Sequence, residues 1–202
     1  MKNRIQTLKT LLFTVLTACG VASAQADIHS YSVSFGPAPG ITSSGTGTGS
    51  VIYDDVTHML SLQANFSGLT GTTSASHIHA PTTTPFVIGG AIVATPTPTF
   101  PGFPNGVTSG AYSDTLDLTL ASSWNASFIT ANGGTAATAE AAFANYMAEG
   151  RAYWNIHTSF AAGGEISGFL TVVPEPSSLA LLGLGLGGIA TRVWSKRRAR
   201  KA

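Results

Sequence analysis

Alternating apolar and polar residues run through the middle of the chain and predict β-strands. The clearest example is THMLSLQANF, in which Leu60, Leu62, Ala64 and Phe66 alternate with polar side chains. A period of two is typical of a strand with one face in the core and the other in solvent. The same alternation marks YSVSF at 31–35, YSDTLDLTL at 112–120 and YWNIHT at 153–158, and shorter apolar stretches predict strands near 51–53 and 165–173.

Two segments interrupt this pattern. TPTPTFPGFPNG, at 95–106, holds four prolines, which lack a backbone donor, so we expect an exposed loop rather than a central strand. TAATAEAAFANYMAE, at 135–149, is rich in alanine and precedes Gly150, which predicts one helix. Together the patterns predict an all-β domain over residues 27–173, an antiparallel β-sandwich or barrel of about eight strands with one helical insertion.

Residues 1–26 have the features of a secretory signal peptide. Basic residues precede an apolar run, and small residues end at Ala24-Gln25-Ala26, which favours cleavage after Ala26. A second interpretation uses LTAC at 16–19, which resembles a bacterial lipobox and would make Cys19 an acylated terminus. Cys19 is the single cysteine of the chain, so either cut leaves a domain without an intramolecular disulfide.

Residues 174–202 combine three features in order. Pro174, Glu175 and Pro176 come first, a Gly- and Leu-rich stretch follows, and the chain ends in a basic block that includes Arg197 and Arg198. The stretch at 176–194 predicts a short transmembrane helix, and the basic block predicts that the domain lies outside the cytoplasm. A basic tail can also bind nucleic acid, but a tail that directly follows an apolar stretch favours the membrane interpretation.

This order of short motif, helix and basic tail resembles the PEP-CTERM sorting signal of Gram-negative bacteria. The resemblance implies recognition by an exosortase, removal of the tail, and delivery to the surface of cells that usually make exopolysaccharide. The protein would cross the inner membrane, be anchored transiently by its C-terminal helix, and reach the cell surface or the extracellular matrix.

The charge of the domain differs from that of the whole chain. The chain carries a formal net charge of +1, but between residues 27 and 173 Arg151 stands alone against eight Asp and Glu residues. An acidic domain of this kind disfavours nucleic acid and anionic membrane surfaces as partners and tolerates cations.

Two histidines stand one residue apart in SHIHAP, at 76–81. In a strand His77 and His79 would share one face, and YWNIHT would place His157 on one face of a second strand with Tyr153 and Asn155. If these two strands pair, three imidazoles meet at one place.

Other polar residues have simpler interpretations. His29 follows the predicted cut closely, where we expect a mobile terminus, and His58 begins a strand, where we expect a packing or capping role. Asp54 and Asp55 favour a hairpin turn over a metal site, because Asp is common in turns.

SHIHAP, YWNIHT and the later GGEISGFL together resemble the CHRD domain, a module named after chordin and widespread in bacterial secreted proteins. The resemblance spans about residues 31–172 and implies a β-domain. Family members usually have Gly where Ala80 stands and Arg where Ser167 stands, and the second change removes a cation that could pair with Glu165. The family has no settled biochemical activity, so the resemblance implies a fold rather than a reaction.

The histidines have three interpretations. One is a copper or zinc site made by His77, His79 and His157, with Glu165 as a further candidate ligand and one coordination position open. The second is the strongest form of the first, an oxidoreductase resembling copper/zinc superoxide dismutase. That enzyme also holds copper with His-x-His on a β-sandwich, and the analogy is one of fold alone. The third is a buried polar network in which the imidazoles hydrogen-bond to neighbouring groups and fix the strand register.

No nucleophile motif, phosphate-binding Gly loop or zinc-finger spacing appears in the chain. We therefore expect no enzyme, but a surface-sorted binding or structural protein of the envelope or the exopolysaccharide matrix, with a copper- or zinc-binding protein as the alternative. The expected partners are an exosortase and, beyond it, exopolysaccharide or an envelope protein.

Overall fold

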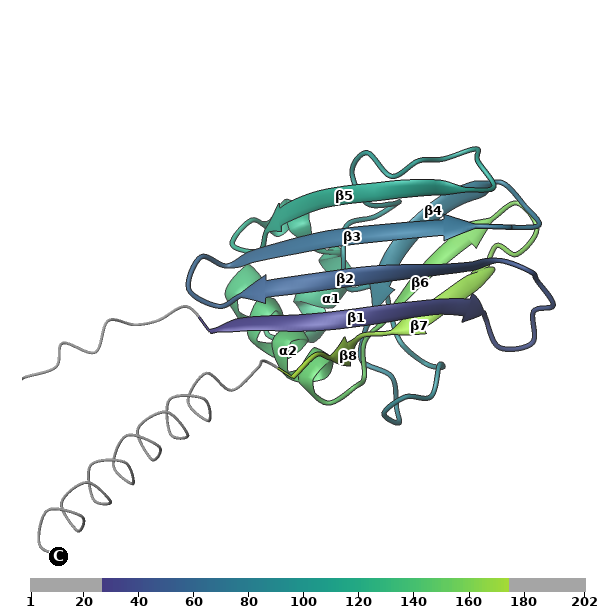
Figure 1. Ribbon diagram of the computed structural model, residues 1–202. Coiled ribbons are helices and arrows are strands. Elements are labelled where there is room, and N and C mark those ends of the chain that lie inside the picture. Colours follow the sequence, from purple (N-terminus) through teal and green to yellow (C-terminus); the bar gives the residue numbers. More distant parts are fainter. Residues whose placement is uncertain (1–26, 175–202) are drawn as a thin grey trace, which may run out of the picture.

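The computed structural model describes residues 27–174, and the predicted signal peptide and transmembrane helix lie outside them. Within this part, eight strands and two α-helices follow one another along the chain (Figure 1). The strands are β1 (Ile28–Pro37), β2 (Thr46–Asp54), β3 (Met59–Ser67), β4 (Thr73–His79), β5 (Gly110–Asp117), β6 (Tyr153–Thr158), β7 (Ile166–Phe169) and β8 (Thr171–Val172). The helices are α1 (Ala126–Ala131) and α2 (Ala136–Ala148), preceded by a 3₁₀ turn at Ala121–Ser123.

All the strands join one antiparallel sheet in the order β4-β6-β7-β1-β2-β3-β5, and β8 pairs with β1. β1 is shared between two halves of the sheet, because its first part pairs with β2 while Gly36 and Pro37 pair with β7. The sheet curls into half a barrel and stays open, since β4 and β5 end the order (Figure 1). The all-β expectation is confirmed, but the sheet does not close into a barrel.

The core lies on the concave side of the sheet. Leu60, Leu62 and Ala64 of β3 are almost fully buried, as their alternation predicts. Trp154 on β6 is fully buried and contacts Phe35 of β1 edge-on, with ring centroids 5.6 Å apart. The two halves of the sheet therefore hold one continuous core between them.

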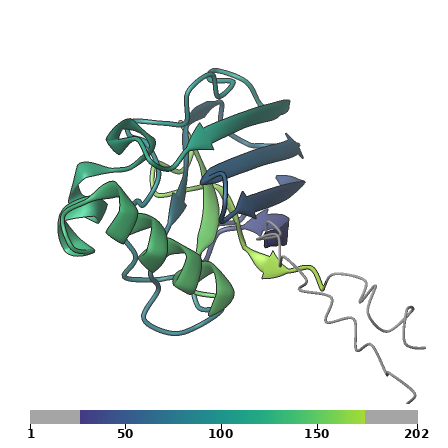
Figure 2. The same cartoon turned by 90° about the vertical axis from the view of Figure 1, so that its left-hand side faces the viewer.

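The two helices lie together beside the curved sheet (Figure 2). The predicted helix at 135–149 is confirmed as α2, whose capping box is formed by Thr135 and Thr138. Its buried Phe143 contacts Trp124 edge-on, which ties α2 to the turn before α1. α1 was not predicted, because six residues are too few to show a helical period. Neither helix of residues 27–174 has the length and apolar character that crossing a membrane requires.

The proline-rich segment at 95–106 contains no strand, as predicted, but it is not an exposed loop. Phe100 is fully buried, and Phe103 is 5% exposed. The backbone N–H of Phe100 donates to the carbonyl of Ser76 on β4 at 3.1 Å. The prolines prevent a strand, but the two rings anchor the loop in the core because burying each removes a large apolar surface from water. The loop is thereby fixed along β4, beside His77.

Candidate metal centre

His77, His79 and His157 lie on the same face of two paired strands. β4 and β6 are antiparallel neighbours, with His77 opposite Asn155 and His79 opposite Tyr153. Residues two apart in a strand point the same way, so His157 joins the two histidines of β4. The intervening residues Ile78 and Trp154 point into the core and are fully buried. The expectation that the three imidazoles meet is confirmed.

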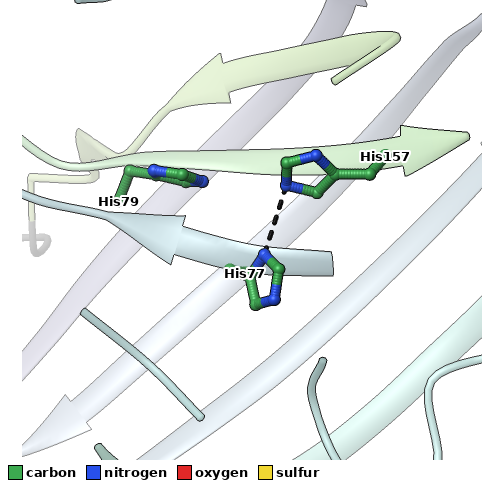
Figure 3. A group of neighbouring side chains, drawn as sticks. All are labelled: His77, His79 and His157. Carbon is green, nitrogen blue, oxygen red and sulfur yellow. Dashed lines mark hydrogen bonds between the residues drawn. The ribbon is translucent and has the colours of Figure 1, made fainter. Parts of the chain in front are cut away.

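The three rings converge on one point (Figure 3). Nδ1 of His77 lies 3.2 Å from Nε2 of His157. The ring centroid of His79 lies 6.0 Å from that of His77 and 5.9 Å from that of His157. One nitrogen from each ring can be chosen so that all three lie within 4.8 Å of one another.

The other nitrogen of each ring faces a backbone carbonyl. Nε2 of His77 lies 2.5 Å from the oxygen of Pro98, Nδ1 of His157 lies 2.8 Å from that of Ala162, and Nδ1 of His79 lies 3.4 Å from that of Ala91. A carbonyl oxygen only accepts hydrogen bonds, so each of these nitrogens carries the proton of a neutral imidazole. The nitrogens that face the common point therefore present lone pairs, as metal-ligating histidines do.

This arrangement leaves acceptors without donors. Nδ1 of His77 and Nε2 of His157 lie 3.2 Å apart, and with both outer nitrogens protonated neither of these two atoms has a proton to donate to the other. Nε2 of His79 is buried, and no hydrogen-bond donor within residues 27–174 reaches it. A buried acceptor without a partner is costly, and a cation at the common point would satisfy all three nitrogens at once.

Burial keeps the three rings neutral. Removal from water lowers the pKa of His79 to about 4, although its hydrogen bond to Ala91 opposes this effect. Burial also lowers the pKa of His77 and that of His157, in each case against a hydrogen bond to a backbone carbonyl. A neutral imidazole binds a metal without first losing a proton, so protonation would not oppose a metal at this place at neutral pH.

Glu165 does not join the three histidines, although the sequence made it a candidate ligand. Its fully buried carboxylate accepts from the backbone N–H of Thr70 at 2.6 Å and of Gly71 at 3.0 Å, and from the hydroxyls of Ser43 and Thr158. Burial raises the pKa of Glu165, but these four hydrogen bonds outweigh it and hold the pKa at about 2. Glu165 therefore ties the loops after β1 and β3 to β6.

The structure also places Ala80 and Ser167, the two residues that depart from the family motif. Ala80 is fully buried directly after β4. Ser167 on β7 lies opposite Asn155 on β6, so it borders the face that carries the histidines. The four groups that donate to Glu165 are all neutral, so hydrogen bonds and no ion pair among residues 27–174 hold its carboxylate.

Sequence reasoning missed the groups that orient the rings. The carbonyls of Ala91, Pro98 and Ala162 belong to loops, and a backbone oxygen leaves no signature in a sequence. Tyr153 stacks on His79 with ring centroids 5.0 Å apart and planes 9° from parallel. The alternation of YWNIHT already placed Tyr153 on the face of His157, and that signal could have found it.

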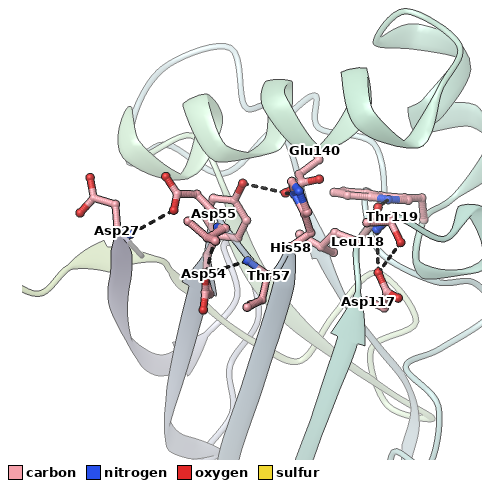
Figure 4. Close-up of polar contacts among 12 residues, drawn as sticks. Asp27, Asp54, Asp55, Thr57, His58, Asp117, Leu118, Thr119 and Glu140 are labelled. Carbon is pink, nitrogen blue, oxygen red and sulfur yellow. Dashed lines mark hydrogen bonds and ion pairs between the residues drawn. The ribbon is translucent and has the colours of Figure 1, made fainter. Parts of the chain in front are cut away.

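The remaining histidines are held by other contacts. His29 is not in a mobile terminus but in β1, where it stacks on Tyr53. His58 lies in the turn before β3 with a φ of 59°, and its Nδ1 contacts the carboxylate of Glu140 on α2 at 2.8 Å (Figure 4). The predicted hairpin turn is confirmed, because Asp54 accepts from the backbone N–H of Val56 and Thr57.

Comparison with protein families agrees with this architecture. A family model of the CHRD domain matches residues 24–170. The chain belongs to the CHRD domain family. A second family model, the PEP-CTERM protein-sorting motif, matches residues 172–198. Neither the curated proteins nor the solved structures contain a match to the chain.

The two matches indicate how the cell exports and processes this CHRD protein. A CHRD domain followed by a PEP-CTERM motif marks an exported surface protein that an exosortase recognises and processes at the membrane. Pro174 is the last residue that the structure describes. Glu175, Pro176, Arg197 and Arg198 belong to the matched motif and lie outside the described residues.

Proposed function

We propose that this CHRD protein binds one copper or zinc ion at the cell surface through His77, His79 and His157, and that it acts by binding rather than by turnover. The observation that carries the proposal is the placement of the ring nitrogens. Each outer ring nitrogen faces a carbonyl, so three unprotonated nitrogens face one point.

The residues fit such an ion in type and in spacing. Imidazole nitrogens suit zinc and copper, and three of them leave a further coordination position. Two nitrogens that bind one zinc ion at about 2.0–2.1 Å lie no more than about 4 Å apart. The 3.2 Å between His77 Nδ1 and His157 Nε2 meets this limit. All three nitrogens lie within 4.8 Å of one another, so a movement of His79 by no more than about 1 Å would bring the whole group within the same limit.

A polar network without metal is the second interpretation, and it explains less. A network fixes strand register by pairing donors with acceptors, yet here two lone pairs face each other and the inner nitrogen of His79 has no donor among the described residues. Protein hydrogen bonds satisfy only the outer nitrogens. The inner nitrogens have lone pairs but no donors among the described residues, and a bound cation would satisfy them.

Binding without turnover is supported by the charges of the described domain. Arg151 is the one Lys or Arg among residues 27–174, and it is engaged by the carbonyl of Thr82 at 2.7 Å and the carboxylate of Glu149 at 3.2 Å. An oxidoreductase for an anion such as superoxide gains speed from cationic side chains that attract its substrate. The acidic surface here would repel such an anion.

The outer face of the sheet suits a neutral partner in the extracellular matrix. Across β1, β2, β3 and β5 one row of side chains reads Ser32, Ser50, Gln63 and Ser113. The next row reads Ser34, Thr48, Asn65 and Ala111. Uncharged hydroxyl and amide groups match the hydroxyls of a neutral exopolysaccharide, which is the partner we propose for this face.

Elemental analysis tests the metal proposal. The processed protein is purified from the periplasm without a His-tag and compared with a His77→Ala/His79→Ala variant and with His58→Gln, which removes a histidine outside the centre. We expect the wild type and His58→Gln to hold one more equivalent of copper or zinc than the double variant. Equal metal in all three proteins, after each has been incubated with zinc and shown to be folded, would contradict the proposal.

A further inference from the structure

A second set of metal-binding groups lies where the described chain begins. Asp27, His29 and Asp55 each offer one atom, and these atoms lie within 4.8 Å of one another. The backbone nitrogen of Asp27 lies 3.0 Å from a carboxylate oxygen of Asp55 (Figure 4). Two exposed carboxylates beside a histidine do not by themselves make a site. What sets this place apart is its position in the processed chain.

Removal of a signal peptide after Ala26, which the sequence predicts, would make Asp27 the first residue. The terminus would then read Asp27-Ile28-His29, with a free α-amine two residues before an imidazole. In such a terminus the amine, the next two backbone amide nitrogens and the nearer ring nitrogen of the histidine can close small fused chelate rings around one ion. Four nitrogens in a plane are the donor set that Cu²⁺ and Ni²⁺ prefer.

We propose that the processed amino terminus binds one Cu²⁺ or Ni²⁺ through the α-amine of Asp27, the amide nitrogens of Ile28 and His29, and Nδ1 of His29. The two amide protons and any proton on the amine pass to solvent when the ion binds. The site shares no ligand with His77, His79 and His157, and it would bind its ion whether or not that centre is filled.

The fold allows this terminus to wrap around an ion at little cost. The ladder between β1 and β2 begins with Ile28 opposite Asp54 and His29 opposite Tyr53. Ile28 is 39% exposed, and the first core side chain of β1 is Tyr31, which is 4% exposed. Binding would open only the first two pairs of the ladder and the stack of His29 on Tyr53, and the ends of strands open easily. The hydrophobic core begins at Tyr31, beyond the two ladder pairs that binding would open.

Asp55 adds an acidic neighbour that favours a cation at this place. Its carboxylate already accepts from the backbone nitrogen of Asp27. After processing, the same position faces an α-ammonium or a bound ion, and both are attracted by a carboxylate at this distance. Asp55 is a neighbour of the four nitrogens and not one of them.

The test uses the processed full-length domain as cells export it. Mass spectrometry first identifies the amino-terminal residue, and CuCl₂ and NiCl₂ are then titrated in separate experiments while the visible absorption is recorded. We expect one equivalent of each ion to produce the d–d band of square-planar nitrogen coordination. We expect this band to be absent from His29→Ala and from a variant with one alanine inserted before Asp27.

Ile28→Pro provides the sharpest control, because proline has no amide proton to release and is tolerated at the start of a strand. It keeps Asp27, His29 and Asp55 but removes one of the four nitrogens. A band that survives Ile28→Pro would overturn the proposal in favour of a side-chain cluster, and a first residue other than Asp27 would overturn it outright. The His77→Ala/His79→Ala variant keeps the band, so failure here is distinct from failure of the three-histidine centre.

Discussion

Nδ1 of His77 and Nε2 of His157 face each other at 3.2 Å, although the other nitrogen of each ring faces a carbonyl. In neutral rings both facing atoms are therefore acceptors. This pairing is unfavourable in the metal-free protein and becomes favourable when a cation lies between the rings. If the centre binds a metal as proposed, the loops that supply the carbonyls would favour the bound state.

Zinc should stabilise the folded domain through this centre. A ligand that binds only the folded state adds about 2.7 kcal/mol at a free concentration one hundred times its Kd. For a domain of this size we expect the thermal unfolding midpoint to rise by several degrees, at about 2–4 °C per kcal/mol. Calorimetry with and without ZnCl₂ measures the shift. It should vanish in His157→Ala and persist in His58→Gln, and a shift retained by His157→Ala would count against the three-histidine centre.

The metal-free protein should lose stability as the pH falls below about 6.5. Burial holds the pKa of His79 at about 4, whereas in the unfolded chain it has the ordinary value of about 6.5. Between these values the unfolded chain binds a proton that the folded protein does not, so the free energy of unfolding falls as the pH drops from 6.5 to 4. Urea unfolding at pH 7 and pH 4.5, in the presence of a chelator, measures this loss.

His79→Gln is the matched variant for that experiment, because it keeps a polar side chain but does not titrate. We expect a smaller loss of stability between the two pH values than in the wild type. The contribution of carboxylates is shared by both proteins and cancels in the comparison. Identical losses would mean that His79 remains accessible to protons in the folded state.

Glu165 should act as a structural anchor and not as a ligand. Glu165→Gln replaces an acceptor-only carboxylate with an amide whose NH₂ group faces donors from Ser43, Thr70, Gly71 and Thr158. We expect a loss of about 2–4 kcal/mol in the free energy of unfolding, because several charge-assisted hydrogen bonds are weakened in a buried place. Glu149→Gln, at an exposed carboxylate, should cost less than about 1 kcal/mol.

Two further measurements separate the anchor from a ligand. The zinc content of folded Glu165→Gln should equal that of the wild type. The pKa of Glu165 is about 2 in the folded protein, below its ordinary value, so its contribution is present above about pH 4.5 and is lost as the pH falls towards 2. If Glu165→Gln folds normally but holds no zinc, Glu165 is a ligand and not only an anchor.

The sequence predicted the face of the candidate centre but not its surroundings. Alternation placed His77 and His79 on one side of a strand, and it placed His157 beside Tyr153, because side-chain direction follows directly from a period of two. The orienting carbonyls depend on where loops fold, which alternation does not encode. Glu165 was misassigned for the same reason, since its donors at Thr70 and Gly71 lie far away in the chain. The open sheet likewise depends on β1 pairing with both β2 and β7.

Phe100 should link the stability of the domain to the affinity of the centre. Its ring is fully buried against Trp154 and Tyr112, with centroid distances of 5.5 Å and 5.7 Å. Phe100→Ala should therefore lower the free energy of unfolding by about 3–5 kcal/mol. The same loop carries Pro98, whose carbonyl orients the ring of His77. Loosening the loop should weaken zinc binding about 10–100-fold, as loss of an orienting partner does elsewhere.

Leu120→Ala is the control for this prediction, because Leu120 is 52% exposed and lies after β5, outside the connection that supplies the carbonyls of Ala91 and Pro98. Urea unfolding and zinc titration are measured on both variants at a temperature where each is folded. We expect Leu120→Ala to lose little stability and to keep its zinc affinity. If Phe100→Ala is destabilised but binds zinc as tightly as the wild type, the carbonyl of Pro98 does not orient His77, and the centre is held by the two strands alone.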